Sequence, residues 1–140
     1  INYALEKEHC DRIIDIATLT GAAVTALGTQ IAAVLTNNES WLEQLKNAAA
    51  FTGENIWQLP AVEEYKELIK SEIADLKNSG GPSAGTITAG LFLQEFVQSK
   101  PWLHIDIAGT AFKDKESGIY NYGATGAGVR LLTTLLKYME

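Results

Sequence analysis

Ile14-Asp15-Ile16-Ala17 and Ile105-Asp106-Ile107-Ala108 are two copies of one tetrapeptide, and together they decide the fold of this 140-residue chain. Each copy ends a short apolar run, and each is followed at once by small residues and threonine. An apolar run that is too short for a helix and leads into Gly and Thr is typical of a buried parallel strand. Open α/β sheets bind their ligands at the edge where such strands end. We therefore expect the functional site in the loops that follow the two copies.

Helical and extended patterns alternate along the rest of the chain. Apolar residues at helical spacing predict helices over residues 1–9, 20–28, 39–51, 62–70, 86–98 and 129–139. Short apolar runs predict extended segments over residues 12–17, 30–36, 56–60 and 102–108. Residues 112–128 are polar, aromatic and rich in glycine, which predicts a long surface loop. The alternation predicts an α/β domain with a largely parallel sheet flanked by helices.

Single residues mark the ends of several predicted elements. A hydroxyl of the Thr18-Leu19-Thr20-Gly21 turn is expected to cap the second helix, and Asn37-Asn38 favours a turn. Gly53 follows the third helix where a helix would end. In the last helix the residues that share one register, and so predict its apolar face, are Leu132, Leu135, Leu136 and Met139.

Composition limits the classes of function. The net charge is −6 and no Lys/Arg cluster is present, which argues against a nucleic-acid surface because phosphate binding needs grouped cations. No apolar stretch approaches the ~20 residues of a membrane helix, and the N-terminus has no signal-peptide pattern. Cys10 is the only cysteine, so no internal disulfide can form, which fits a reducing cytoplasm. The chain is long enough for one core, and because it starts at Ile1 already in a helical rhythm we expect it to be part of a longer protein.

A glycine-rich segment precedes the fifth predicted helix. Residues 79–86, Ser-Gly-Gly-Pro-Ser-Ala-Gly-Thr, could bind an anion with free backbone amides at the start of that helix. The segment lacks the Gly-Lys-Ser/Thr ending of a phosphate loop, and Pro82 removes one amide donor. Phosphate binding is therefore the less favoured interpretation.

Three polar residues of the two repeats allow more than one interpretation. His104 and Asp106 are two apart on a strand, so they share a face and could ligate one metal, although a hydrogen-bonded core pair is favoured. Asp15 and Asp106 occupy equivalent places in the repeats and could act as an acid/base pair, although strand-end aspartates more often bind loop amides. No Gly-x-Ser-x-Gly elbow supports a serine nucleophile, Cys10 follows a charged helix, and His9 is expected at the surface.

A longer series of motifs gives these residues a context. In chain order they are Asp-Ile-Ala-Thr-Leu-Thr-Gly-Ala (15–22), Gly28, Trp57, Leu59-Pro60, Ala-Asp-Leu-Lys-Asn (74–78), Ser-Ala-Gly (83–85), Thr-Ala-Gly (88–90), Trp102, His-Ile-Asp-Ile-Ala-Gly-Thr-Ala (104–111) and Gly-Ala-Thr-Gly (123–126). The series covers essentially the whole chain, and it closely resembles the cytosolic leucyl aminopeptidase family.

The resemblance implies a cytoplasmic, hexameric exopeptidase that uses two divalent metal ions, Mn or Zn, to release N-terminal residues, with leucine favoured. In that family a lysine and several acidic residues hold the metals, within a Gly-Lys-Gly and Asp-Ser-Gly-Gly region and an Asn-Thr-Asp-Ala-Glu-Gly-Arg motif. This chain contains neither sequence. The resemblance therefore implies that residues 1–140 are the C-terminal part of the catalytic domain and contribute no catalytic residue and no metal ligand. The metal-binding part and the N-terminal domain would lie upstream.

The resemblance also assigns substrate-binding residues. Thr18, Leu19, Thr20 and Gly21 match the loop whose backbone orients the substrate peptide, with the Leu19 carbonyl as the expected acceptor. Ala108 and Ala111 match positions of the pocket for the N-terminal side chain, and Ser79 falls near the leaving-group side. Small residues would leave room for a leucine-sized group in an apolar pocket that rejects charge. From the residues alone, an equally good interpretation is that small residues let strand and helix pack closely.

The functional expectation has two forms. In the first, the chain supplies the substrate-binding wall of a metal-dependent aminopeptidase acting on peptides, and is inactive alone because its metal ligands lie elsewhere. In the second, it is a non-catalytic assembly or binding module derived from the same family. The absence of the metal-binding motifs is the feature that supports the second form.

Overall fold

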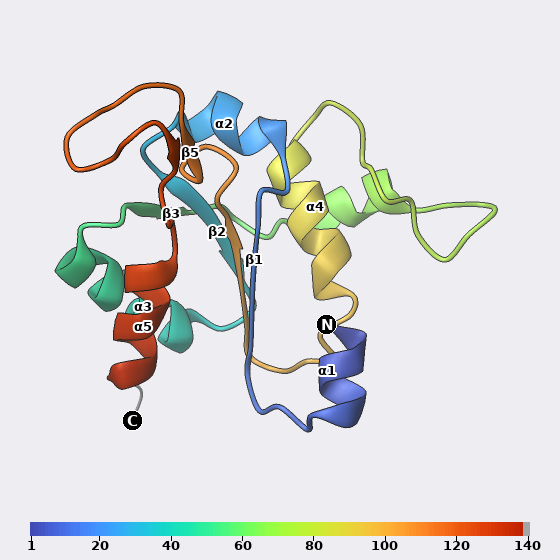
Figure 1. Ribbon diagram of the computed structural model, residues 1–140. Helices are drawn as coiled ribbons and strands as arrows, with labels where there is room; N and C mark the ends of the chain where they lie inside the picture. The colour runs from blue at the N-terminus through green and yellow to red at the C-terminus, as the bar shows by residue number, and fades with distance from the viewer. Residues whose placement is uncertain (139–140) are drawn as a thin grey trace.

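The second copy of the tetrapeptide lies inside the sheet and the first lies at its edge. The computed structural model describes residues 1–138. The strand order is β1 (Ile13–Ala17), β4 (Trp102–Asp106), β2 (Ala32–Thr36) and β3 (Ile56–Gln58), as Figure 1 shows. β1 pairs with β4 in parallel and β2 with β3 in parallel, whereas β2 and β4 are antiparallel. The predicted α/β fold with a largely parallel sheet is confirmed, with one antiparallel pairing at its centre.

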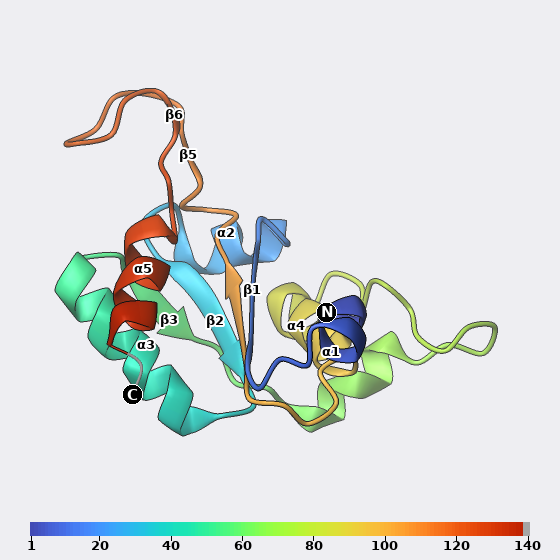
Figure 2. The ribbon, with the colours of Figure 1, turned by 60° about the horizontal axis from the view of Figure 1, so that its bottom comes forward.

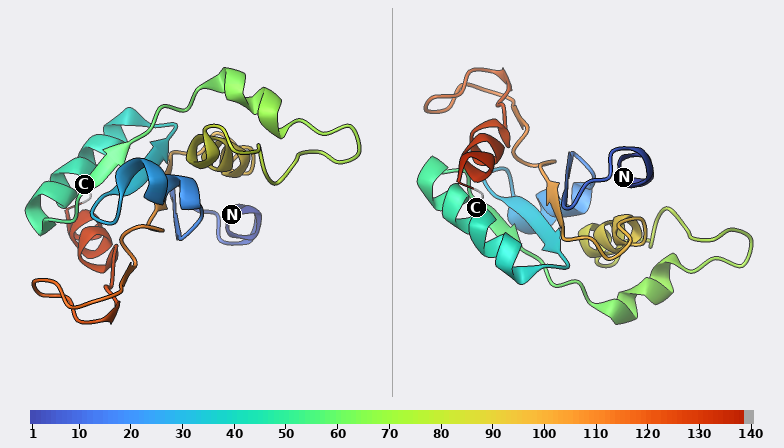
Figure 3. Two further views of the ribbon diagram at one scale, coloured as in Figure 1. Left: turned by 90° about the horizontal axis from the view of Figure 1, so that it is seen from above. Right: turned by 90° about the horizontal axis from the view of Figure 1, so that it is seen from below.

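Helices cover both faces of this sheet, as the end-on views of Figure 3 show. One face carries α3 (Glu39–Thr52) and α5 (Val129–Lys137), and the other carries α1 (Asn2–Lys7) and α4 (Gly85–Gln94). The short helix α2 (Gly21–Leu27) follows β1 directly and packs against α4 and β2. The sheet thus forms the middle of three layers.

Side chains of the central strand alternate between the two helical layers, as the period of a strand requires. Leu103 and Ile105 belong to the core with α3 and α5, whereas Trp102 belongs to the core with Leu5 of α1. All five residues of β4 are buried, and so are all five of β2. This burial on both faces explains the uninterrupted apolar runs in the sequence.

The predicted helix ends agree with the local chemistry. Thr20 is the N-cap of α2, and its side chain accepts a hydrogen bond from the Ala23 amide. Asn38 caps α3 in the same way by accepting from the Trp41 amide. Gly53 ends α3 in the left-handed conformation with φ of 70°, where a side chain would be strained.

The structure corrects four predictions. Residues 62–70 contain a 3₁₀ helix, η1 (Glu63–Ile69), because Ile69 is its only buried residue and offers little apolar surface for an α-helix to bury. α4 ends at Gln94 and not at residue 98, since Gln98 and Ser99 adopt positive φ. Residues 112–128 are not only loop, because β5 (Phe112–Lys113) and β6 (Gly123–Ala124) pair as a hairpin that projects beyond α2 in Figure 2.

The fourth correction concerns the face of the last helix. α5 buries Leu131 and Leu135, and Leu132 packs against the same core, so the prediction is right for Leu132 and Leu135. Leu131 takes the place predicted for Leu136, which is 62% exposed. Met139 lies outside the described residues. Within residues 1–138 no helix has the length and apolar character needed to cross a bilayer.

Lys66 ties η1 to the end of α4 and gives a pH-dependent prediction. Hydrogen bonds to Glu63 and then Glu95 raise the pKa of Lys66 above its ordinary value of 10.5. The stabilisation by this lysine should be fully present below pH 10.5 and be lost as the pH rises through the raised pKa. We expect the difference in unfolding free energy between the protein and its Lys66→Met variant to shrink over that range. A difference that stays constant up to the pH of alkaline unfolding would contradict the assignment.

Candidate functional site

The loop after the first repeat, residues 18–21, connects β1 directly to α2. Thr18 and Leu19 are exposed, and Leu19 is 40% accessible although it is apolar. Thr20 has extended φ and ψ and points its hydroxyl back at the helix that it caps. The loop therefore presents an exposed apolar residue between a strand end and a helix start, at the edge of the sheet where ligand sites are expected.

The turn after the second repeat, residues 107–111, lies beside this loop. The Ile107 amide donates to the carbonyl of Ala17, the last residue of β1, which continues the parallel pairing one residue past the end of β4. The amides of Thr110 and Ala111 both donate to the carbonyl of Ile107, at 3.0 and 2.9 Å, and close a tight turn. Ala108 and Ala111 are half-buried in this turn.

Asp106 joins the two loops. Its Oδ1 accepts hydrogen bonds from the amides of Leu19 and Ala108, both at 3.1 Å, and its Oδ2 accepts from the hydroxyl of Thr20 at 2.7 Å. The side chain is 1% exposed, and within residues 1–138 it forms no ion pair. The interpretation that a strand-end aspartate binds loop amides is confirmed for Asp106.

Asp15 has a different role, because the two repeats pair out of step. The register places Asp15 opposite His104 and Ala17 opposite Asp106, so the repeats are offset by two residues, and the two aspartates, although equivalent in the repeats, are not paired with each other. Asp15 accepts from Nε1 of Trp102 at 2.6 Å and bonds Nδ1 of His104 at 2.5 Å. The predicted core pair is therefore corrected, since His104 bonds to Asp15 and not to Asp106.

Neither aspartate fits the two metal ions that the resemblance implies. The Asp106 oxygens are engaged by two amides and a hydroxyl, and the Asp15 oxygens by an indole and an imidazole. Within residues 1–138 no group of three or more His, Cys, Asp or Glu side chains could hold a metal ion. The oxygens of both aspartates are thus already engaged by donors within the fold.

A cavity of about 290 Å³ opens beside the first loop. Four of the seven predicted substrate-binding residues line it, namely Leu19, Thr20, Gly21 and Ser79. Thr18, Ala108 and Ala111 are not among its lining residues: Thr18 is exposed, the Ala108 amide donates to Asp106, and Ala111 leads into the hairpin. The structure therefore brings the first loop and Ser79 together at this cavity, and joins the second turn to the first loop through Asp106.

The sequence interpretation missed two threonines of this region. Thr86 lies in the first turn of α4 and is 3% exposed. Its hydroxyl oxygen is 2.8 Å from the hydroxyl oxygen of Thr20. Thr88 lines the cavity and leaves no space for a side chain at Gly80, where a Cβ would lie 2.9 Å from the Cβ of Thr88. Two threonines early in a segment that is otherwise apolar are the signal in the sequence that could have identified them.

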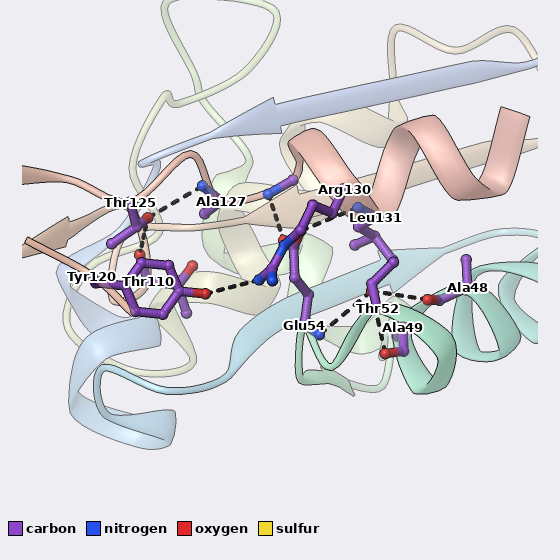
Figure 4. Close-up of polar contacts among 11 residues, drawn as sticks. Ala48, Ala49, Thr52, Glu54, Thr110, Tyr120, Thr125, Ala127, Arg130 and Leu131 are labelled. Carbon is purple, nitrogen blue, oxygen red and sulfur yellow. Dashed lines mark hydrogen bonds and ion pairs between the residues drawn. The ribbon is translucent and has the colours of Figure 1, made fainter. Parts of the chain in front are cut away.

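A second cavity of about 120 Å³ lies against the opposite face of β4. The Glu54 carboxylate accepts from the amides of Gly128 and Leu131, at 2.6 and 3.1 Å, and so caps α5 (Figure 4). Arg130 approaches the same carboxylate and also donates to the hydroxyl of Tyr120 in the hairpin, at 2.8 Å. These contacts join the hairpin to the start of α5.

Comparison with known proteins shows which protein family this chain is similar to. A model described as "Cytosol aminopeptidase family, catalytic domain" matches residues 1–133. A "Probable cytosol aminopeptidase" of Clostridium perfringens is 57% identical over 135 residues, which cover 96% of this chain and 27% of the relative. One of Alkaliphilus metalliredigens with the same name is 54% identical over 140 residues, covering 100% of this chain and 28% of the relative.

Solved structures agree with this relationship. A mutant of tomato leucine aminopeptidase superposes with a TM-score of 0.89 at 39% identity, covering 96% of this chain and 26% of that one. The bottromycin maturation enzyme BotP gives a TM-score of 0.89 at 36% identity over 94% of this chain and 30% of that one. The chain spans about a quarter of the length of the curated relatives that it matches. With the family match extending over residues 1–133, the chain belongs to the cytosol aminopeptidase family.

Proposed function

We propose that this chain forms the substrate-binding wall of a metal-dependent aminopeptidase that releases N-terminal residues from peptides, with leucine favoured. One observation carries the proposal: Asp106 ties the loop of residues 18–21 to the turn of residues 107–111 at the carboxyl edge of the sheet. Family membership supports the peptidase activity.

The first loop would bind the substrate backbone. The Leu19 amide donates to the buried Asp106 carboxylate, which fixes one end of the loop backbone, and Leu19 itself is exposed. In this proposal the Leu19 carbonyl accepts from the substrate, and Thr20 and Gly21 complete the wall.

The second turn would select the N-terminal side chain. Ala108 and Ala111 offer only methyl groups and are half-buried, which suits an apolar pocket of leucine size. Ser79 lines the same cavity as Gly21, and in this proposal it faces the leaving group.

The metal ions would be held outside these residues. We propose two divalent ions, Mn or Zn, with ligands in a part of the protein that precedes this chain, which would then be the C-terminal part of the catalytic domain. One solved structure of BotP is a complex with Mn, and that chain superposes at a TM-score of 0.87. A cytoplasmic hexamer is proposed on the same family grounds.

Hydrolysis of leucyl-p-nitroanilide with added Mn²⁺ tests the proposal. The full-length protein that carries this chain should hydrolyse the anilide, and residues 1–140 alone should not. Tight calorimetric binding of two Zn²⁺ or Mn²⁺ ions to residues 1–140 alone would contradict the metal assignment. A full-length protein without peptidase activity would favour the alternative, a non-catalytic binding or assembly module, which the lack of a ligand cluster within residues 1–138 supports.

The Ala108→Phe variant of the full-length protein tests the pocket. A phenyl ring in the half-buried turn should exclude a leucine side chain, and overpacking of this kind corresponds to a loss of about 100-fold in kcat/KM for leucyl-p-nitroanilide. Ala50→Phe, on the exposed surface of α3, is the matched control and should keep the activity. Equal kcat/KM for the two variants would remove Ala108 from the pocket.

A further inference from the structure

Thr20 is the centre of a directed hydrogen-bond chain. Its Oγ1 lies 2.7 Å from Oδ2 of Asp106, 2.8 Å from Oγ1 of Thr86 and 3.1 Å from the amide of Ala23. A hydroxyl has a single hydrogen to donate, and an ionised carboxylate can only accept. Thr20 therefore donates to Asp106, and Thr86 must donate to Thr20. The hydrogen bonds thus connect α4, through Thr20 of the first loop, to Asp106 at the end of β4.

Because Asp106 is buried, its hydrogen bonds are sensitive to any displacement of the two loops. A carboxylate that is 1% exposed and forms no ion pair within residues 1–138 depends on hydrogen bonds for its stability. Its donors come from the first loop, through Leu19 and Thr20, and from the second turn, through Ala108. If either loop moves, both the carboxylate and the buried donors lose partners, so the loops are coupled energetically.

We propose that Asp106 is a positioning residue, which sets the orientation of residues 18–21 relative to residues 107–111 and thereby links turnover to the choice of N-terminal side chain. This role rests on the proposed function, in which the first loop binds the peptide backbone and the second turn binds its side chain. A shift between them would misplace the scissile bond of a substrate whose side chain is correctly seated. Misplacement by about 1 Å is enough to lower the rate about 100-fold.

The Asp106→Asn variant of the full-length protein changes the hydrogen bonds around residue 106 with little change in the shape of the side chain. The amide group can still accept from Leu19 and Ala108, but its NH₂ group now faces a hydroxyl that needs an acceptor. We expect kcat/KM for leucyl-p-nitroanilide to fall about 100-fold. We also expect the preference for leucyl over alanyl anilide to fall about tenfold, because an uncharged amide oxygen holds the Leu19 and Ala108 amides less strongly than a carboxylate does and Thr20 loses its acceptor.

Variants of Thr20 separate this role from a loss of folding. Thr20→Val removes the hydroxyl and should lower the leucyl preference as Asp106→Asn does, whereas Thr20→Ser keeps the hydroxyl and should restore the preference. The matched control is Thr36→Val. It removes another buried hydroxyl, which donates to the Trp102 carbonyl at the opposite end of β4, and it should leave the leucyl-to-alanyl ratio unchanged.

Hydrogen exchange at the amides of Leu19 and Ala108 gives a readout that is independent of activity. The proposal predicts faster exchange at both amides in Asp106→Asn, together with the lowered leucyl preference. Equal losses of kcat/KM on leucyl and alanyl anilides would overturn it, since they would show a structural contribution alone. If the unsubstituted protein hydrolyses neither anilide, the proposed function fails and this role fails with it, whereas an active protein with an unaltered ratio in Asp106→Asn overturns only the positioning role.

Discussion

Alanine in place of Gly109 should destabilise the protein by about 3 kcal/mol or more. A Cβ at this position would lie far inside van der Waals contact with the backbone carbonyl oxygen of Gly28, a clash that only movement of the main chain can relieve. Gly109 lies between Ala108 and Thr110 in the second turn, so the relief would displace the proposed side-chain pocket. Guanidinium denaturation of the two proteins measures the loss.

A second glycine at the same edge of the sheet provides the control for Gly109. At Gly21 a Cβ would meet no atom within 4 Å, so Gly21→Ala should change the unfolding free energy by less than about 1 kcal/mol. A similarly small loss for Gly109→Ala would show that the end of α2 does not press against the second turn as the structure has it.

Asp15→Ala should destabilise the protein by about 2–6 kcal/mol, because each of two buried donors left without an acceptor costs about 1–3 kcal/mol. His104 and Trp102 are fully buried, and both direct a ring nitrogen at Asp15. An unprotonated Nδ1 would face a carboxylate that can only accept, so Nδ1 of His104 carries the hydrogen. Without Asp15, two buried N–H groups lose their acceptor.

No other contact is expected to restore the stability lost with Asp15. The second ring nitrogen of His104, Nε2, is buried without a hydrogen-bond partner among the described residues, so a flip or rotation of the ring does not give its N–H a new acceptor. Asp11→Ala, at an exposed aspartate four residues earlier, is the control and should change stability by less than about 0.5 kcal/mol. Equal denaturation midpoints for Asp15→Ala and Asp11→Ala would refute the network.

The strands and their loops could be predicted from sequence because each is a short apolar run that ends in small residues, and β4 is in addition buried on both faces. Ile14 to Ala17 and Ile105 to Ala108 are apolar runs that end in small residues, and β1 and β4 end at Ala17 and Asp106. Their relative register could not be predicted, since the repeats pair with a shift of two residues that preserves which side chains share a face. That shift gave Asp15 and Asp106 different partners.

For the candidate site, too, some features could be predicted from the sequence and others could not. Leu19, Thr20, Gly21 and Ser79 lie around one cavity, although the segments that hold them are about 60 residues apart in sequence. The hydrogen bonds from Thr86 to Thr20 and from Thr20 to Asp106 could not be predicted. No sequence pattern indicates which residue a threonine hydroxyl will bond. Hydrogen bonds between distant segments depend on the packing of α4 against α2, which local propensity does not encode.

A crystal structure of the full-length protein with a leucyl dipeptide whose peptide bond is reduced to CH₂–NH tests the central claim most directly. The account predicts that the ligand backbone contacts residues 18–21, with a hydrogen bond to the Leu19 carbonyl, and that the leucyl side chain contacts Ala108 and Ala111. A ligand bound away from both loops, with Asp106 still joining them, would contradict the account.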